Sequence, residues 1–244
     1  MTAEQYLQRA FLLASQANPK AIRPNPFVGA VVVSENGEIV GEGFHQKAGE
    51  AHAEVMAIHQ ALDHGAKLET CTLYVTLEPC SHTGKTPPCT DLIIQHRIPR
   101  VVIGSMDPNP LVSGVRILEE HGVKVDVFII PEIVTLNDTF NINQTLKRPK
   151  YVLKSAITLN GKIADHSGNS QWISNEESRN HVHQFLRTAA DAILTTAKTI
   201  IRDDATMNIR IKDRMEQELN LIVFDRNLDL LKKENHQHSI FCRG

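Results

Sequence analysis

Residues 72–103 read TLYVTLEPCSHTGKTPPCTDLIIQHRIPRVVI. The segment begins with a strand-like apolar run at 72–77, continues with a helical pattern over 90–95 and ends with a second strand-like run at 101–103. A strand, a helix and a strand in this order predict a βαβ unit and hence a partly parallel sheet.

The residues before this segment extend the same sheet. A capping box opens a predicted amphipathic helix over 2–18, and two predicted strands, 28–33 and 39–44, flank Asn36-Gly37. Because Asn-Gly favours the positive φ of a tight turn, these two strands are expected to form an antiparallel hairpin. Apolar residues at helical spacing after His52 then predict a helix.

A helix around 115–120 and a strand over 123–130 complete the predicted first domain. We therefore expect a three-layer α/β/α unit at residues 1–145. The polar, proline-ended stretch at 145–149 marks a domain boundary, so a second domain is expected at 146–244.

The second domain is predicted to be α/β as well. Its expected strands are 151–156, 192–195 and 219–224, and its expected helix covers 175–187. About 95 residues are few for a complete cofactor-binding domain, so this domain is expected to be partial.

Composition narrows the classes of function. The 244 residues include 26 Lys and Arg against 28 Asp and Glu, a balance that offers no broad basic surface for nucleic acid. The longest apolar runs have the length of strands, and the start lacks a signal-peptide pattern. We therefore expect a cytoplasmic enzyme that acts on small molecules, without membrane or nucleic-acid partners.

Candidate metal ligands stand at His52, Cys80 and Cys89. One nitrogen and two sulfur ligands suit a catalytic Zn²⁺ that keeps its fourth position for water. Two thiolates would balance the charge of the metal. Glu54, two residues after the histidine, is placed to move protons without being a ligand.

His52-Ala53-Glu54, Pro79-Cys80 and the later Cys89 resemble the signature of the cytidine-deaminase-like superfamily of zinc deaminases. The longer spacing between the two cysteines, together with 24–30 and 107–110, resembles the bifunctional deaminase/reductase family of riboflavin biosynthesis.

This resemblance implies zinc-hydroxide hydrolytic deamination of 2,5-diamino-6-(5-phosphoribosylamino)pyrimidin-4(3H)-one to 5-amino-6-(5-phosphoribosylamino)uracil. Glu54 would be the proton shuttle, Asn25 would bind the pyrimidine ring and Lys85 the phosphate. A homo-oligomer, a dimer or a tetramer, is expected by resemblance alone.

The second segment resembles the start of the NADPH-dependent, dihydrofolate-reductase-like domain of the same family, which reduces the ribosyl chain to ribityl. No G-x-G-x-x-G motif is present in the sequence, so the resemblance alone carries this expectation. By match to the family, the substrate contacts would be Ser170, Arg187 and Arg210, and the NADPH contacts would be Ala156, Trp172, Thr199 and Asp203. Ala205 stands where the family usually has proline, and a later glycine-rich cofactor segment is not found, so reduction is expected to be poor.

Other interpretations stay open. The chain could be another zinc deaminase acting on a nucleoside or nucleobase, or a non-catalytic binding protein stabilised by zinc. The long Cys80–Cys89 spacing argues against the other deaminases, and Glu54 argues against the non-catalytic protein. Among the contacts, Lys85 fits a solvated loop as well as a phosphate contact. Asn25 could stabilise a proline-rich turn, and Trp172 could be a packing anchor.

Overall fold

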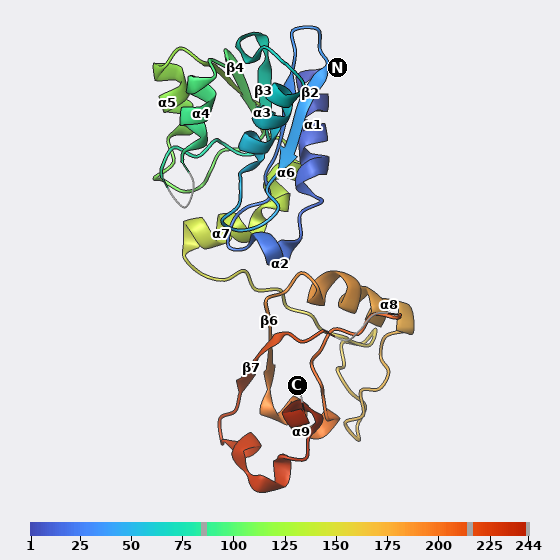
Figure 1. Cartoon of the computed structure of the whole chain (residues 1–244). Helices are drawn as coiled ribbons and strands as arrows, with labels where there is room; N and C mark the ends of the chain where they lie inside the picture. Colours follow the sequence, from blue (N-terminus) through green and yellow to red (C-terminus); the bar gives the residue numbers. More distant parts are fainter. Residues whose placement is uncertain (84–86, 214–216, 243–244) are drawn as a thin grey trace. The chain divides into compact units, whose positions relative to one another are not determined.

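The computed structural model describes residues 1–83, 87–213 and 217–242. The chain divides into two compact units, Met1–Tyr151 and Val152–Gly244 (Figure 1).

A five-stranded sheet forms the centre of the first unit. Its spatial order is β2-β1-β3-β4-β5, in which β1 is antiparallel to β2 and β3, whereas β3, β4 and β5 are parallel. The strands are β1 (Gly29–Val33), β2 (Ile39–Phe44), β3 (Thr72–Val75), β4 (Arg100–Ile103) and β5 (Lys124–Val127). The predicted hairpin is confirmed, and Gly37 in its turn has a φ of 81°.

Helices cover both faces of this sheet (Figure 1). One face packs against α1 (Ala3–Ala14) and α6 (Pro131–Leu136), and the other against α3 (Ala53–Asp63), α4 (Cys89–Gln95) and α5 (Gly114–Glu120). The alternation of side chains along β1 explains the two cores, because Val31 and Val33 face α1 while Ala30 and Val32 face α3. The expected three-layer α/β/α architecture is confirmed.

The first helix starts as its sequence predicts and ends earlier. Thr2 and Gln5 form the capping box, with the Gln5 N–H 3.3 Å from the Thr2 hydroxyl and the Thr2 N–H 2.8 Å from the Gln5 amide oxygen. The helix stops at Ala14, and a separate short helix, α2 (Pro19–Ile22), begins after the capping residue Asn18. The predicted end at residue 18 is therefore wrong.

The end of the first unit also differs from the prediction. The strand expected over 123–130 stops at Val127, and α6 is followed by α7 (Asp138–Leu146), which sequence periodicity did not indicate. The sequence of α7, DTFNINQTL, is rich in polar residues of low helix propensity and has no buried residue. Its apolar residues, Phe140, Ile142 and Leu146, are two and four residues apart and do not repeat at helical spacing.

The helix α3 lies unusually close to β2. A Cβ atom built on Gly41 would lie 2.0 Å from the carbonyl oxygen of Ala57, and one on Gly43 would lie 2.5 Å from that of Ala53. Because no real Cβ tolerates such contacts, glycine at both positions allows the backbone of the helix to rest on the strand. The first turn of α3 is thereby fixed over the sheet.

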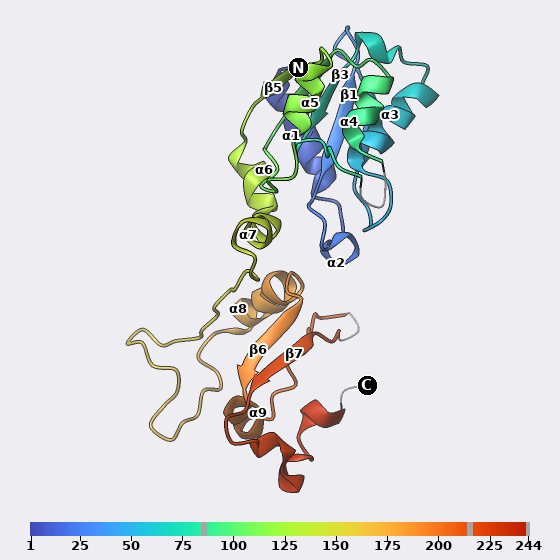
Figure 2. The ribbon, with the colours of Figure 1, turned by 90° about the vertical axis from the view of Figure 1, so that its left-hand side faces the viewer.

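The second unit contains a two-stranded parallel sheet of β6 (Ala192–Thr196) and β7 (Asn220–Phe224), which correspond to the strands expected at 192–195 and 219–224 (Figure 2). Its helices are α8 (Glu176–His181), continued by the π-helical segment η2 (Val182–Arg187), and α9 (Ala197–Asp203). The short 3₁₀ segments of the chain are η1 (Leu68–Thr70), η3 (Asp229–Leu231), η4 (Lys233–Asn235) and η5 (Ser239–Cys242).

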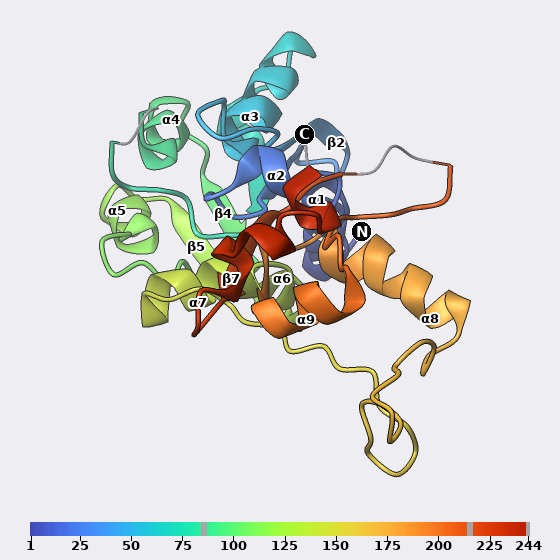
Figure 3. The ribbon, with the colours of Figure 1, turned by 90° about the horizontal axis from the view of Figure 1, so that it is seen from below.

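The strand expected over 151–156 is not formed. These residues belong to the long coil between α7 and α8 (Figure 3), and Leu153 in this coil is 96% exposed. A strand persists only where its backbone pairs with a neighbour, and in the described part of the second unit the paired strands are β6 and β7.

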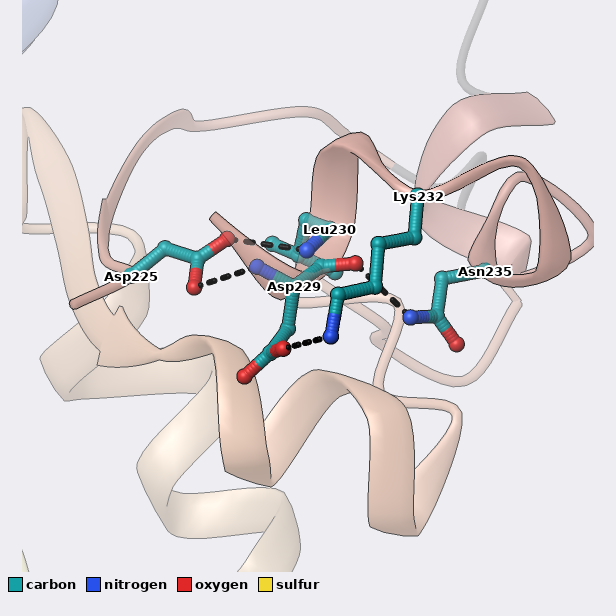
Figure 4. A network of polar contacts seen from close by, with 5 residues as sticks. All are labelled: Asp225, Asp229, Leu230, Lys232 and Asn235. Atoms are coloured by element: carbon teal, nitrogen blue, oxygen red, sulfur yellow. Dashed lines mark hydrogen bonds and ion pairs between the residues drawn. The ribbon is translucent and has the colours of Figure 1, made fainter. Parts of the chain in front are cut away.

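Local polar contacts shape the chain after β7 (Figure 4). The carboxylate of Asp225 accepts hydrogen bonds from the N–H groups of Asp229 at 2.9 Å and Leu230 at 2.8 Å, which starts η3. Lys232 pairs with the Asp229 carboxylate at 2.6 Å, and the Asn235 amide donates to the Asp229 carbonyl at 2.7 Å. These bonds satisfy backbone groups of a turn.

Within the described ranges, no helix is both long enough and apolar enough to cross a bilayer.

Candidate metal and catalytic site

The starts of two helices and one loop meet at one place in the first unit. His52 is the residue that precedes α3, Cys89 is the first residue of α4, and Cys80 lies in the loop that leaves β3. The carboxyl ends of β3 and β4 lie at the same edge because these strands are parallel, and loops at such an edge commonly form sites.

The side chains of these three residues converge. The His52 Nδ1 atom lies 3.3 Å from the Cys89 sulfur and 3.5 Å from the Cys80 sulfur, and the three candidate ligand atoms lie within 4.8 Å of one another. Tetrahedral Zn²⁺ with ordinary bond lengths separates a nitrogen and a sulfur ligand by about 3.6 Å. The three residues therefore fit zinc both in donor type and in spacing.

Hydrogen bonds prepare Cys80 to be a thiolate. Contacts with the Cys89 side chain, with His52 and with the Cys89 backbone N–H lower the pKa of the Cys80 thiol to about 4, while the same side-chain contact and burial raise the pKa of Cys89. The backbone N–H belongs to the first turn of α4, where N–H groups have no partner within the helix. A thiolate is the form that binds metal.

Glu54 is buried beside these residues. Its side chain is 3% exposed, and its position in the first turn of α3 follows directly from that of His52. Burial first, and then the charge of Cys80, raise the pKa of the Glu54 carboxyl to about 7. A group with a pKa near neutrality can both accept and deliver a proton.

Asn25 lies next to a histidine that sequence reasoning missed. The Asn25 amide nitrogen lies 3.0 Å from Nε2 of His45, which is 3% exposed. Nδ1 of His45 lies 3.2 Å from the carbonyl oxygen of Ala51, and the ring meets that of His52 edge-on with centroids 5.6 Å apart. An isolated histidine after a strand gave no sequence signal for this link between Asn25 and the metal site.

Glu78 is a second residue that sequence reasoning missed. It is 6% exposed, and its carboxylate accepts hydrogen bonds from the N–H of Val115 at 3.0 Å and of Asp107 at 3.3 Å. The Ser113 N–H also donates to the Ser81 hydroxyl at 2.8 Å. The loop that carries Cys80 is therefore tied to residues 107–115. The only sequence signal was an acidic residue inside an otherwise apolar motif.

Lys85, the expected phosphate contact, lies outside the residues that the structure describes.

In the second unit, two of the expected substrate residues lie close together. The Arg187 guanidinium donates to the Asn208 carbonyl, and burial together with the nearby charge of Arg210 lowers the pKa of Arg187. The Arg210 N–H donates to Nδ1 of His183 at 2.9 Å. Burial, followed by the charges of Arg187, Arg210 and Lys154, lowers the pKa of this histidine to about 4. Such a cluster of positive charge suits an anion.

The other expected residues of this unit are dispersed. Ala156, Ser170 and Trp172 belong to the coil before α8, and Trp172 is 68% exposed with the Arg179 guanidinium 4.3 Å from its ring centroid. Thr199 and Asp203 stand one turn apart on α9, and Arg202 of the same helix donates to the Ser167 carbonyl at 3.1 Å. This contact brings the coil against α9.

Two family descriptions match separate parts of the chain. Residues 1–105 match the cytidine and deoxycytidylate deaminase zinc-binding region, and residues 149–243 match the RibD C-terminal domain.

Curated relatives are similar over most of this chain. The riboflavin biosynthesis protein RibD of Aquifex aeolicus is 47% identical over 223 residues, which is 90% of this chain and 61% of the relative. The protein of the same name from Escherichia coli is 43% identical over 89% of this chain and 58% of the relative. The chain thus spans about three fifths of the length of these relatives.

Two solved structures resemble this chain over most of its length. A diaminohydroxyphosphoribosylaminopyrimidine deaminase/5-amino-6-(5-phosphoribosylamino)uracil reductase from Thermotoga maritima superposes with a TM-score of 0.82 at 43% identity, covering 93% of this chain and 64% of that one. Acinetobacter baumannii RibD superposes with a TM-score of 0.82 at 34% identity, covering 99% of this chain and 67% of that one.

Proposed function

Because the chain belongs to the RibD family of riboflavin biosynthesis proteins, we propose that its first domain, residues 1–145, is a zinc-dependent deaminase. The proposed reaction hydrolyses the 2-amino group of 2,5-diamino-6-(5-phosphoribosylamino)pyrimidin-4(3H)-one and releases ammonia and 5-amino-6-(5-phosphoribosylamino)uracil. The observation that carries the proposal is the convergence of His52, Cys80 and Cys89 beside the buried Glu54.

His52, Cys80 and Cys89 would hold the metal. Zinc in a site of this kind lowers the pKa of water and so supplies a nucleophile near neutral pH. The protein contributes a fixed geometry, because two of these ligands stand at helix starts and the third in a loop that Glu78 holds.

Glu54 would carry the protons. Hydrolytic deamination must remove a proton from water and add one to the nitrogen that leaves as ammonia. A buried carboxyl with a pKa of about 7 can do both in sequence, taking the proton on a carboxylate oxygen and delivering it to the amine. Its burial keeps bulk water away from the transfer.

The substrate would be oriented by contacts beside the metal site. Asn25 would hydrogen-bond the pyrimidine ring, and its hydrogen bond to His45 supports a fixed orientation of its amide. Lys85 would pair with the phosphate as a point charge.

The deciding experiment measures ammonia release from zinc-loaded protein with three substrates: the diaminopyrimidine phosphate, cytidine and guanine. We expect release from the first alone. Release from cytidine or guanine only would identify a different zinc deaminase, and protein that retains zinc but releases no ammonia from any of them would indicate a non-catalytic zinc-stabilised protein.

For residues 146–244 we propose the NADPH-dependent reduction of the ribosyl chain to ribityl, on the strength of the match to the RibD C-terminal domain. Ser170, Arg187 and Arg210 would bind the phosphorylated substrate, a role that the clustered charge of the two arginines supports. Ala156, Trp172, Thr199 and Asp203 would contact NADPH.

This second activity has its own test. Calorimetric titration with NADPH, beside a coupled assay of its oxidation, would detect cofactor binding and reduction. Arg187→Ala should abolish any reduction and leave deamination unchanged. Loss of both activities in this variant would contradict two separate phosphate sites.

A homo-oligomer and a cytoplasmic location are further proposals. Size-exclusion chromatography with light scattering would test the oligomeric state.

A further inference from the structure

One buried amide from a distant part of the sequence contacts the segment that carries Asn25. Asn137 lies between α6 and α7 and is 2% exposed. It falls between residues 105 and 149, which neither matching family description covers.

The Asn137 side chain forms two hydrogen bonds with the backbone of one residue. Its Oδ1 atom accepts a hydrogen bond from the Phe27 N–H at 2.8 Å, and its Nδ2 atom donates to the Phe27 carbonyl at 2.9 Å. The Phe27 N–H belongs to the peptide before this residue and its carbonyl to the peptide after it, so the Asn137 amide fixes the orientation of both peptides that flank Phe27.

Phe27 ends the loop that carries Asn25. The sequence of this loop is Pro24-Asn25-Pro26-Phe27, and its two prolines fix φ and lack an N–H donor. The Asn25 N–H donates to the carbonyl of Ile22, the last residue of α2, at 2.9 Å. A rigid loop transmits a shift at one end to the other end, so a displacement of Phe27 would displace Asn25.

The side-chain amide of Asn25 has a contact of its own. Its amide meets His45, whose own N–H donates to the carbonyl of Val28, the residue after Phe27. Asn25 therefore lies between a contact to His45 and a segment that is fixed by Asn137.

We propose that Asn137 is a positioning residue of the deaminase, which fixes the loop of residues 24–27 and, through it, the amide of Asn25. This inference rests on the proposed function only in assigning Asn25 to the substrate ring. It makes the α6–α7 junction a working part of the deaminase.

The first test is kinetic. Asn137→Ala should raise the KM for the diaminopyrimidine phosphate roughly tenfold, with a smaller change in kcat and with zinc content unchanged. In the Asn25→Ala background, the same substitution should change KM less than about twofold, because the amide through which it acts is gone.

Asn141→Ala is the matched control. The Asn141 amide lies on α7 and donates to the Val134 carbonyl at 3.3 Å, within the α6–α7 segment. This variant should keep the wild-type KM. Asn137→Asp preserves the shape and one of the two hydrogen bonds, so it provides a second variant with a raised KM if the alanine variant folds poorly.

The second test does not need activity. Hydrogen exchange measured by mass spectrometry should show faster exchange in the peptide containing residues 24–28 in Asn137→Ala, but not in Asn141→Ala. Unchanged exchange, an unchanged KM, or fully additive effects with Asn25→Ala would each overturn the inference. Inactive wild-type protein with the expected exchange would instead refute the deaminase proposal and leave the role of Asn137 in the loop standing.

Discussion

The backbone N–H of Cys89 donates a hydrogen bond of 3.2 Å to the sulfur of Cys80. The two candidate metal ligands are thus joined through a backbone group of the first residue of α4. Because the donor is a backbone N–H, this bond does not depend on the Cys89 side chain. The ligand role of Cys89 can therefore be tested by substitution while Cys80 keeps its contact with α4.

Cys89→Ser should therefore abolish zinc binding without unfolding the domain. Serine keeps the backbone N–H but does not supply a thiolate, so elemental analysis should fall from one zinc per chain to none. Cys71→Ser is the control, because that buried thiol bonds the Lys67 carbonyl instead. Stoichiometric zinc in the Cys89 variant would refute the assignment.

Glu54→Gln should separate proton transfer from metal binding. The amide has nearly the same shape and cannot carry the proton, so we expect zinc content and folding to be retained while kcat falls by about 10²–10⁴-fold. Steady-state ammonia release and elemental analysis on the same preparation measure both quantities. A variant that deaminates at the wild-type rate would show that another group transfers the proton.

Glu78→Gln should destabilise the first unit. The Glu78 carboxylate accepts two backbone N–H groups, and an amide can accept only on its oxygen, which leaves one of these part-buried donors unpaired. We expect a loss of about 1–3 kcal/mol in the free energy of unfolding, measured by urea titration. Glu38→Gln on the exposed hairpin turn should leave it unchanged. Equal stability of the two variants would contradict a stabilising role for these two hydrogen bonds of Glu78.

His183 should make the stability of the second unit depend on pH. Its pKa falls from the ordinary 6.5 to about 4 in the folded chain, so the unfolded chain binds more protons between these values. Stability should be complete above pH 6.5 and should decline as the pH falls toward 4. Thermal unfolding across this range would measure the decline.

Substitution can assign this pH dependence to one histidine. His183→Asn should reduce it, since an amide oxygen can accept the Arg210 N–H without titrating in this range. His166→Asn, at an exposed site, serves as the control. An identical pH profile in the His183 variant and the wild type would exclude His183 as the source.

The sequence predicted the first unit well because strands and helices alternate there with clear apolar periods. The capping box of Thr2 and Gln5, the hairpin around Gly37 and the parallel pairing of β3 with β4 are all local or nearest-neighbour features. The polar helix α7 was not predicted and the strand expected over 151–156 was wrong, because these structures depend on contacts that no local pattern reveals.

The residues of the candidate site also fall into two groups, those predicted from the sequence and those that only the structure revealed. His52, Glu54, Cys80 and Cys89 stand in short motifs whose chemistry can be read from residue type, and the structure brings the three metal-ligand candidates together. His45, Glu78 and Asn137 act through contacts with residues far away in the sequence. Such contacts become visible only when the chain is folded.

The glycines of β2 determine how this domain can be re-engineered. A methyl group at Gly43 would collide with the carbonyl of Ala53 and push the start of α3 outward. His52 and Glu54 would move with it, although neither was altered. In a library of variants, the least replaceable positions would thus include residues without any side chain, and screens confined to the polar residues of the site would overlook them.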